Sequence, residues 1–125
     1  MHWKLRGTRR KFTPNLNKFG FVYVITNKKN GKAYIGCKQY FLGRSKLKSK
    51  WEIYMGSSKS LLDDIKKTGK KHFKFEVIAE YKNKRSLRYY ECYFQMKYNV
   101  LSTTLEGTDE PAFYNSYVGG KWYRP

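Results

Sequence analysis

Acidic residues are scarce in this sequence, which contains 9 Asp and Glu against 27 Lys and Arg. The 125 residues therefore carry a formal net charge of +18. An excess of one sign this large predicts that the partner is a polyanion. Nucleic acid is the first candidate, because each phosphate contacted by Lys or Arg releases condensed counterions and adds affinity that falls with salt.

Long hydrophobic runs are also missing, and none approaches the roughly 18–20 residues of a transmembrane helix. The first residues, MHWKLRGTRRK, lack the apolar stretch and small-residue cleavage site of a signal peptide. We therefore expect no membrane partner, and an anionic membrane surface is the weaker alternative to nucleic acid. A cytoplasmic protein is predicted.

Cysteine and histidine are too few and too scattered for a structural zinc site. Cys37 and Cys92 lie far apart, as do His2 and His72, and neither pair has CxxC or HxxxH spacing. Two cysteines without an export signal indicate a reduced, cytosolic protein, and one disulfide is the alternative.

Aromatic residues, at 18% of the chain, and hydrophobic residues, at 40%, are abundant enough to form one compact core. Residues 1–18 are basic and show little apolar periodicity, so we expect a basic N-terminal arm outside the core, followed by one domain over residues 19–125. Arg9 and Arg10 of this arm are candidate contacts to phosphates. The alternative is a solvated, disordered tail.

Three segments have the composition of β-strands. Residues 21–26 (FVYVIT) and 33–36 (AYIG) flank an Asn30-Gly31 pair, which supplies the positive φ of a tight turn and predicts an antiparallel hairpin. Residues 73–81 (FKFEVIAEY) alternate apolar and polar side chains, which predicts a third strand.

Helices are expected between and after these strands. The segment 40–51 is basic with scattered apolar positions and is predicted as a helix interrupted by Gly43. A second helix follows Ser58 as its N-cap and ends at Gly69. Residues 84–100 contain no Gly or Pro and place apolar side chains at helical spacing. The predicted fold class is α+β, with a small three-stranded antiparallel sheet flanked by helices, and the tail 102–125 forms loops and short strands.

Because carboxylates are scarce, the position of Glu91 is informative. It lies within the last predicted helix, between Leu87 and Phe94 of the apolar stripe. A carboxylate on the core side of a helix is costly unless it is paired or binds a metal ion. The alternative is an ordinary surface ion pair with Arg88, one helical turn away.

Residues 21–36 (FVYVITNKKNGKAYIG) resemble the signature of the GIY-YIG nuclease family. Tyr23 and Tyr34 stand eleven residues apart, Tyr34-Ile35-Gly36 is intact, and Phe21 and Val22 replace the Gly and Ile of the first half. The resemblance extends from residue 20 to residue 115, and residues 51–62 are similar to phage-encoded members. It implies a DNA endonuclease, of the phage homing type, acting in the cytoplasm of a bacterial host.

The resemblance also implies roles for individual residues. Glu91 matches the glutamate that binds a divalent cation, Mg²⁺ or another such as Mn²⁺, and Asn115 matches an asparagine that closes the site. Arg44 matches the family's arginine, and Lys48 stands where some members have a histidine. Tyr23 or Tyr34 would be the general base.

Cations beside the tyrosines would help the general base to ionise, because a free phenol has a pKa of about 10. Lys32, Lys38 and Arg44 are the candidates. Two other functions stay open: a catalytically silent basic nucleic-acid-binding module, and an RNA nuclease with the same chemistry. The target sequence, nicking or double-strand cleavage, and the oligomeric state are left open by the sequence.

Overall fold

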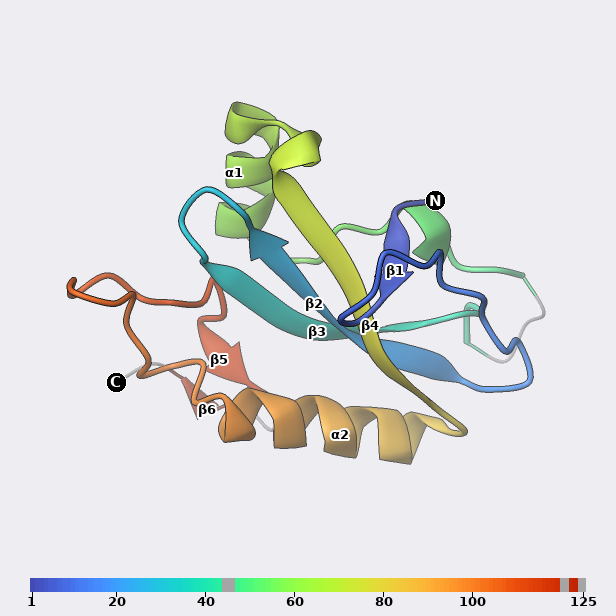
Figure 1. The fold of residues 1–125 in the computed structure, drawn as a ribbon. Helices are drawn as coiled ribbons and strands as arrows, with labels where there is room; N and C mark the ends of the chain where they lie inside the picture. The colour runs from blue at the N-terminus through green and yellow to red at the C-terminus, as the bar shows by residue number, and fades with distance from the viewer. Residues whose placement is uncertain (44–46, 120–121, 124–125) are drawn as a thin grey trace.

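The computed structural model describes residues 1–43, 47–119 and 122–123, and it has an α+β architecture, as predicted (Figure 1). The elements in chain order are β1 (Trp3–Leu5), β2 (Gly20–Asn27), β3 (Ala33–Gln39), the 3-10 helix η1 (Trp51–Ile53), α1 (Lys59–Thr68), the 3-10 helix η2 (Lys70–His72), β4 (Phe73–Tyr81), α2 (Lys84–Lys97), β5 (Tyr117–Val118) and β6 (Trp122–Tyr123). The main sheet has four strands rather than three, in the order β1-β4-β2-β3, and β5 and β6 form a separate pair.

The predicted hairpin is confirmed as β2 and β3, which pair antiparallel around the Asn30-Gly31 turn. Tyr23 is opposite Gly36 and Ile25 is opposite Tyr34. Since directly opposed residues share a face of the sheet, both tyrosines of the signature lie on the same face. β4 pairs with the other side of β2 and confirms the third predicted strand.

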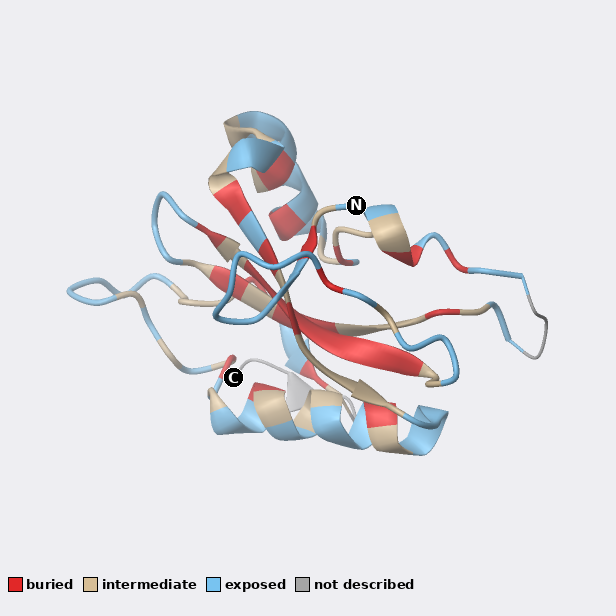
Figure 2. Cartoon of the chain, turned by 45° about the vertical axis from the view of Figure 1, so that its right-hand side comes forward, coloured by how far each residue is buried: buried red, intermediate tan, exposed pale blue. Residues whose placement is uncertain are grey.

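A hydrophobic cluster covers each face of the sheet. On the face of the two tyrosines, Tyr23 packs with Trp3, Trp51 and Leu61. Helix α2 covers the opposite face of the sheet (Figures 1 and 2), and its Leu87 belongs to the hydrophobic cluster on that face. β3 is one of the two outer strands, and groups from both layers can meet at its outer edge.

The helix predicted after Ser58 and the helix predicted over residues 84–100 are confirmed as α1 and α2, each with a capping residue. The Ser58 side chain accepts a hydrogen bond from the Leu61 N–H at the start of α1, and Gly69 ends the helix. α2 begins after Asn83 and ends at Lys97, three residues before the predicted end. No helix within the described ranges is long and apolar enough to cross a membrane.

The prediction that residues 1–18 contribute nothing to the core is wrong. β1 pairs in parallel with β4, and Trp3 and Phe12 are buried in the cluster on the tyrosine face. Two large aromatic side chains supply the burial that holds this basic segment in place. β1 has three residues, too few to show a strand period in the sequence.

The helix predicted over residues 40–51 is also wrong for the part of that segment that the structure describes. Phe41 and Lys48 form an antiparallel bridge, and the Leu42 N–H donates to the Leu47 carbonyl. Gly43 has a φ of 53°, which a right-handed helix does not accept. Residues 41–42 and 47–48 therefore pair with each other before η1 instead of continuing as a helix.

Candidate active site

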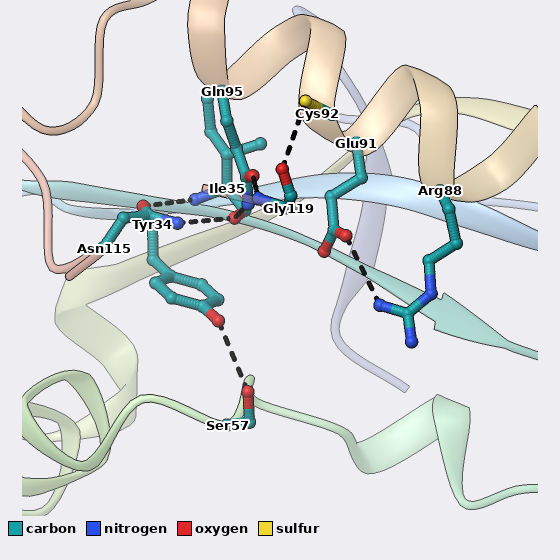
Figure 3. Close-up of polar contacts among 9 residues, drawn as sticks. All are labelled: Tyr34, Ile35, Ser57, Arg88, Glu91, Cys92, Gln95, Asn115 and Gly119. Atoms are coloured by element: carbon teal, nitrogen blue, oxygen red, sulfur yellow. Dashed lines mark hydrogen bonds and ion pairs between the residues drawn. The ribbon is translucent and has the colours of Figure 1, made fainter. Parts of the chain in front are cut away.

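A pocket of about 1260 Å³ lies along the outer edge of β3. It collects side chains from β2, β3, α2, the segment before α1 and the segment that leads to β5. Five of the predicted site residues line it: Tyr23, Tyr34, Lys38, Glu91 and Asn115. Residues that are 92 positions apart in the sequence are thus brought to one site, and Figure 3 shows several of them.

The two tyrosines are positioned by a close approach to Gly36. The centres of the Tyr23 and Tyr34 rings lie 6.2 Å apart. A Cβ atom at residue 36 would come within 2.5 Å of the Tyr23 hydroxyl. A side chain there would displace the phenol, which explains the glycine at this point of the strand. Tyr54 closes the group from the segment after η1, with its ring 6.1 Å from that of Tyr23.

The tyrosines differ in their surroundings. Tyr23 is 1% exposed, and burial raises its pKa well above the ordinary value. The Tyr34 hydroxyl lies 3.3 Å from the Ser57 hydroxyl (Figure 3). Burial raises the pKa of Tyr34 to about 12, against the opposing effect of the Ser57 hydrogen bond. Both phenols are therefore protonated near neutral pH in the free protein.

Glu91 reaches the pocket from α2. Its side chain is 13% exposed, and one carboxylate oxygen lies 3.7 Å from the Arg88 guanidinium (Figure 3). Burial raises the pKa of Glu91, while hydrogen bonds from Cys37 and the charge of Arg88 oppose that shift. The ion pair with Arg88 is confirmed, and the same carboxylate is held at the pocket wall.

Asn115 is 3% exposed, and its amide group pairs with the backbone of β3. Its Oδ1 accepts from the Ile35 N–H at 3.0 Å, and its Nδ2 donates to the Ile35 carbonyl at 2.8 Å. Gln95 of α2 donates to the same carbonyl at 2.9 Å. Asn115 thus fastens the C-terminal segment to the edge of β3 beside the pocket (Figure 3).

The predicted cations are not all at the pocket. Lys38 lines it, with its ammonium group 4.2 Å from the centre of the Tyr54 ring. Lys32 lies over the Tyr114 ring at 4.7 Å, near the hairpin turn. Lys48 is exposed beside Phe41, and Arg44 falls outside the described residues.

Arg9 and Arg10 are exposed in the segment that follows β1, on the side of the sheet opposite to β3. These two arginines are absent from the described lining of the pocket, as are Lys32 and Lys48.

Sequence reasoning missed several pocket residues: Cys37, Tyr54, Ser57, Gln95 and Tyr117. Tyr54 and Ser57 lie within residues 51–62, whose similarity to phage-encoded nucleases was the available signal. Gln95 is one turn beyond Glu91 on the same helix face. Nothing in the sequence ties Cys37 or Tyr117 to the site, because their proximity depends on the fold.

The donors in the pocket fit a hard divalent cation that keeps most of its water. Glu91 is the single carboxylate among the described lining residues, and the described part of the chain holds no cluster of three or more His, Cys, Asp or Glu suited to a metal ion. Mg²⁺ is commonly bound by one or two carboxylates, with water and substrate phosphate oxygens as its other ligands. The arrangement fits such an ion and does not fit a site built wholly from protein ligands.

Known proteins resemble the chain over most of its length. The family model described as "Putative endonuclease segE, GIY-YIG domain" matches residues 3–118. Endonuclease segA of Enterobacteria phage T4 is 31% identical over 104 residues, which is 83% of this chain and 40% of that protein. No solved structure matches the chain. With its two signature tyrosines and Glu91 at one pocket, and a family match from β1 to β5, the chain belongs to the GIY-YIG endonuclease family.

Proposed function

We propose that the chain is a divalent-metal-dependent DNA endonuclease that hydrolyses phosphodiester bonds. The observation that carries the proposal is the meeting of Tyr23, Tyr34 and Glu91 at one pocket on a chain of net charge +18. A protein that only bound phosphates would gain nothing from a mostly buried carboxylate in its binding pocket, because that carboxylate repels the ligand.

Glu91 would hold the cation, Mg²⁺ or another divalent ion such as Mn²⁺. A bound cation supplies positive charge that stabilises the developing phosphorane and the leaving oxygen. Arg88 keeps the carboxylate in place through their 3.7 Å ion pair, and Cys37 donates hydrogen bonds to it. These contacts fix the orientation of Glu91 before a ligand arrives.

Tyr34 is the better candidate for the general base, with water as the nucleophile. It is less buried than Tyr23, and its hydroxyl is already hydrogen-bonded at the pocket wall to Ser57. Its raised pKa means that Lys38, Arg88 and the bound cation must favour the ionised form in the complex with DNA. Tyr23 would donate a hydrogen bond to the phosphate or to the attacking water.

Asn115 would act on the site through β3. Its amide holds the Ile35 backbone, and Ile35 lies between Tyr34 and Gly36. A shift of this strand would move the Tyr34 ring, so Asn115 is a positioning residue rather than a group that touches substrate. Arg44 remains a proposed catalytic cation.

Binding to DNA would be mainly electrostatic. Lys38 is the proposed phosphate contact within the pocket, and Lys32, Lys48, Arg9 and Arg10 would extend the contact outside it. If several phosphates are neutralised, affinity should fall by orders of magnitude between roughly 50 and 200 mM salt.

We further propose that the domain acts in the cytoplasm of an infected bacterium, as part of a phage endonuclease of the homing type. The support is the similarity to segA of phage T4 and the resemblance of residues 51–62 to phage-encoded members. The chain spans 40% of the length of segA.

The deciding experiment is incubation with supercoiled plasmid, with and without Mg²⁺, followed by gel electrophoresis. We expect Mg²⁺-dependent conversion to nicked or linear DNA. DNA binding without cleavage under any divalent cation would leave the silent binding module as the function. A parallel incubation with structured RNA tests the RNA nuclease, which would cut RNA and spare the plasmid.

A further inference from the structure

The outer face of α2 carries a row of four side chains spaced four residues apart. Arg85, Tyr89, Tyr93 and Lys97 recur at the i, i+4 interval, so they lie along one side of the helix. Tyr89 is 65% exposed and Tyr93 is 45% exposed. All four residues are exposed, whereas Leu87 of the same helix is buried against the sheet. We call these four residues the α2 row.

The Tyr89 and Tyr93 rings of the α2 row pack against a neighbouring pair of stacked tyrosines. Tyr90 stacks on Tyr81 of β4, with ring centres 4.6 Å apart and planes 10° from parallel. Tyr89 and Tyr93 contact Tyr90 with ring centres at 5.1 and 6.0 Å. Lys97 lies 5.8 Å from the Tyr93 ring centre. The exposed rings are thus supported by a stacked pair rather than by flexible side chains.

The α2 row continues into the pocket. Arg85 and Tyr89 line the pocket together with Arg88 and Glu91. A strand that left the pocket along α2 would therefore meet a cation and then two aromatic rings. Between Arg85 and Lys97, 12 positions apart, the helix rises about 18 Å, which is long enough for several nucleotides.

The charge of this face decides which occupant fits. Lys84, Arg85, Arg88 and Lys97 are all exposed on α2, and its one acidic residue, Glu91, is paired with Arg88. A second copy of the chain seated on the same face would bring these cations against their equivalents, which is unfavourable. A nucleic-acid strand offers phosphates to the cations and flat rings to the tyrosines.

We propose that the α2 row binds a DNA strand flanking the bond that is cut, with Arg85 and Lys97 on phosphates and the Tyr89 and Tyr93 rings packed against bases or sugars. The proposal rests on the proposed function, because it assigns the path of the substrate of the same pocket. It adds a non-electrostatic contribution to affinity, which the net charge alone does not predict.

The experiment compares two double variants in binding to fluorescently labelled DNA over a range of salt. Y89A/Y93A should weaken binding by about 10- to 100-fold at every salt concentration and leave the log-log salt slope unchanged. R85A/K97A should instead reduce the slope by about two. Y89F/Y93F keeps the rings and should bind almost as the parent does. Single-stranded and duplex oligonucleotides, tested in parallel, distinguish stacking on bases from packing against sugars.

Two variants on other elements serve as matched controls. K66A/K67A on α1 removes the same charge as R85A/K97A from residues outside the described pocket lining, and I53A removes an exposed apolar side chain of η1. I53A should bind DNA as the parent does at every salt concentration. K66A/K67A should change the slope by less than R85A/K97A. Thermal unfolding checks that every variant is folded.

The outcomes separate this proposal from the proposed function. A parent protein that neither binds nor cuts DNA overturns both. A parent that cuts DNA, with Y89A/Y93A binding like the parent, overturns the α2 row and leaves the nuclease intact. Loss of a dimer in Y89A/Y93A at unchanged DNA affinity, seen by gel filtration, would make the face a self-association surface and also overturn the proposal.

Discussion

The outward backbone groups of the two outer strands, β1 and β3, find their hydrogen-bond partners in different ways. Along β1, the chain folds back on itself, and backbone groups of residues 10–12 pair with Trp3 and Leu5. Along β3, side chains help to complete the edge, with Asn115 and Gln95 bonded to the Ile35 backbone. The β1 edge packs aromatic rings against the core, whereas the β3 edge opens into the pocket.

The difference shows how one sheet can have one edge that is packed and another edge that lines a pocket. Backbone pairing closes an edge at a short, fixed spacing and leaves little room beside the strand. Side chains that reach the same groups from α2 and from the C-terminal segment leave space between the elements that carry them. Polar groups such as Glu91 then occupy that space without losing their hydrogen-bond partners.

The strongest test of the contrast compares one carboxylate at each edge. Glu91→Gln should abolish Mg²⁺-dependent plasmid cleavage while the fold and DNA affinity are kept, because the amide cannot replace a negatively charged ligand. Glu76→Gln is the matched control, since Glu76 accepts a hydrogen bond from the Gly7 N–H beside β1. It should cut at nearly the parent rate. Full activity of the Glu91 variant would remove this residue from the site.

The second test ranks the tyrosines. If Tyr34 is the general base, Tyr34→Phe should lower the rate by about 10²- to 10⁴-fold with little change in stability. Tyr23→Phe should cost less, because a hydrogen-bond donor is lost rather than the base.

The pH dependence of the rate adds to this test. The pKa of Tyr34 is raised to about 12, so the ionised fraction of the free protein grows with pH throughout the neutral range. The parent rate should therefore rise between about pH 6 and 9, and Tyr34→Phe should lack that rise. Parent-like rates in both phenylalanine variants would rule out a tyrosine base.

The third test concerns the β1 edge of the sheet. Trp3 is fully buried and its indole N–H donates to the Trp51 carbonyl at 2.7 Å. Trp3→Ala should lower the free energy of unfolding by about 3–5 kcal/mol, measured by urea denaturation. Lys4→Ala, at the exposed neighbouring position, should change it by less than about 0.5 kcal/mol. Equal stabilities would mean that residues 1–18 are a detached arm after all.

The smallest effect is expected at the β3 edge, where the change is in stability. Asn115→Ala leaves the Ile35 N–H without the Asn115 oxygen, which should cost about 1–3 kcal/mol of stability. Hydrogen exchange of the Ile35 amide should accelerate by more than the change in global stability explains. Ser116→Ala, at the exposed next residue, is the control. Unchanged exchange at Ile35 would show that the asparagine does not secure the strand.

Local patterns predicted the parts of the fold that depend on local chemistry. The hairpin followed from Asn30-Gly31 between β-branched segments, and α1 followed from Ser58 and Gly69 as its caps. β1 could not be predicted in this way, because it is held by Trp3 against residues more than 45 positions later in the chain. Residues 40–51 contain scattered apolar positions that suit a helix, although the Leu42 N–H donates to the Leu47 carbonyl in the structure.

The site was predictable as far as the family resemblance names positions. Tyr23, Tyr34, Glu91 and Asn115 do line one pocket, but the sequence could not tell what Asn115 holds, since its partner Ile35 is 80 residues away. Glu91 had two competing interpretations, an ordinary surface ion pair with Arg88 and a metal ligand. The structure shows the ion pair and places the carboxylate in the pocket lining, and the role as a metal ligand stays a prediction.

The way in which β3 is completed also bears on how the protein behaves at high concentration. An outer strand with free N–H and C=O groups is a template on which other chains add strands and aggregate. On β3, the outward groups of Ala33 and Ile35 are already bonded within the molecule, and Cys37 is hydrogen-bonded to Glu91. The residues that form the pocket wall therefore also withhold this edge from intermolecular β-pairing.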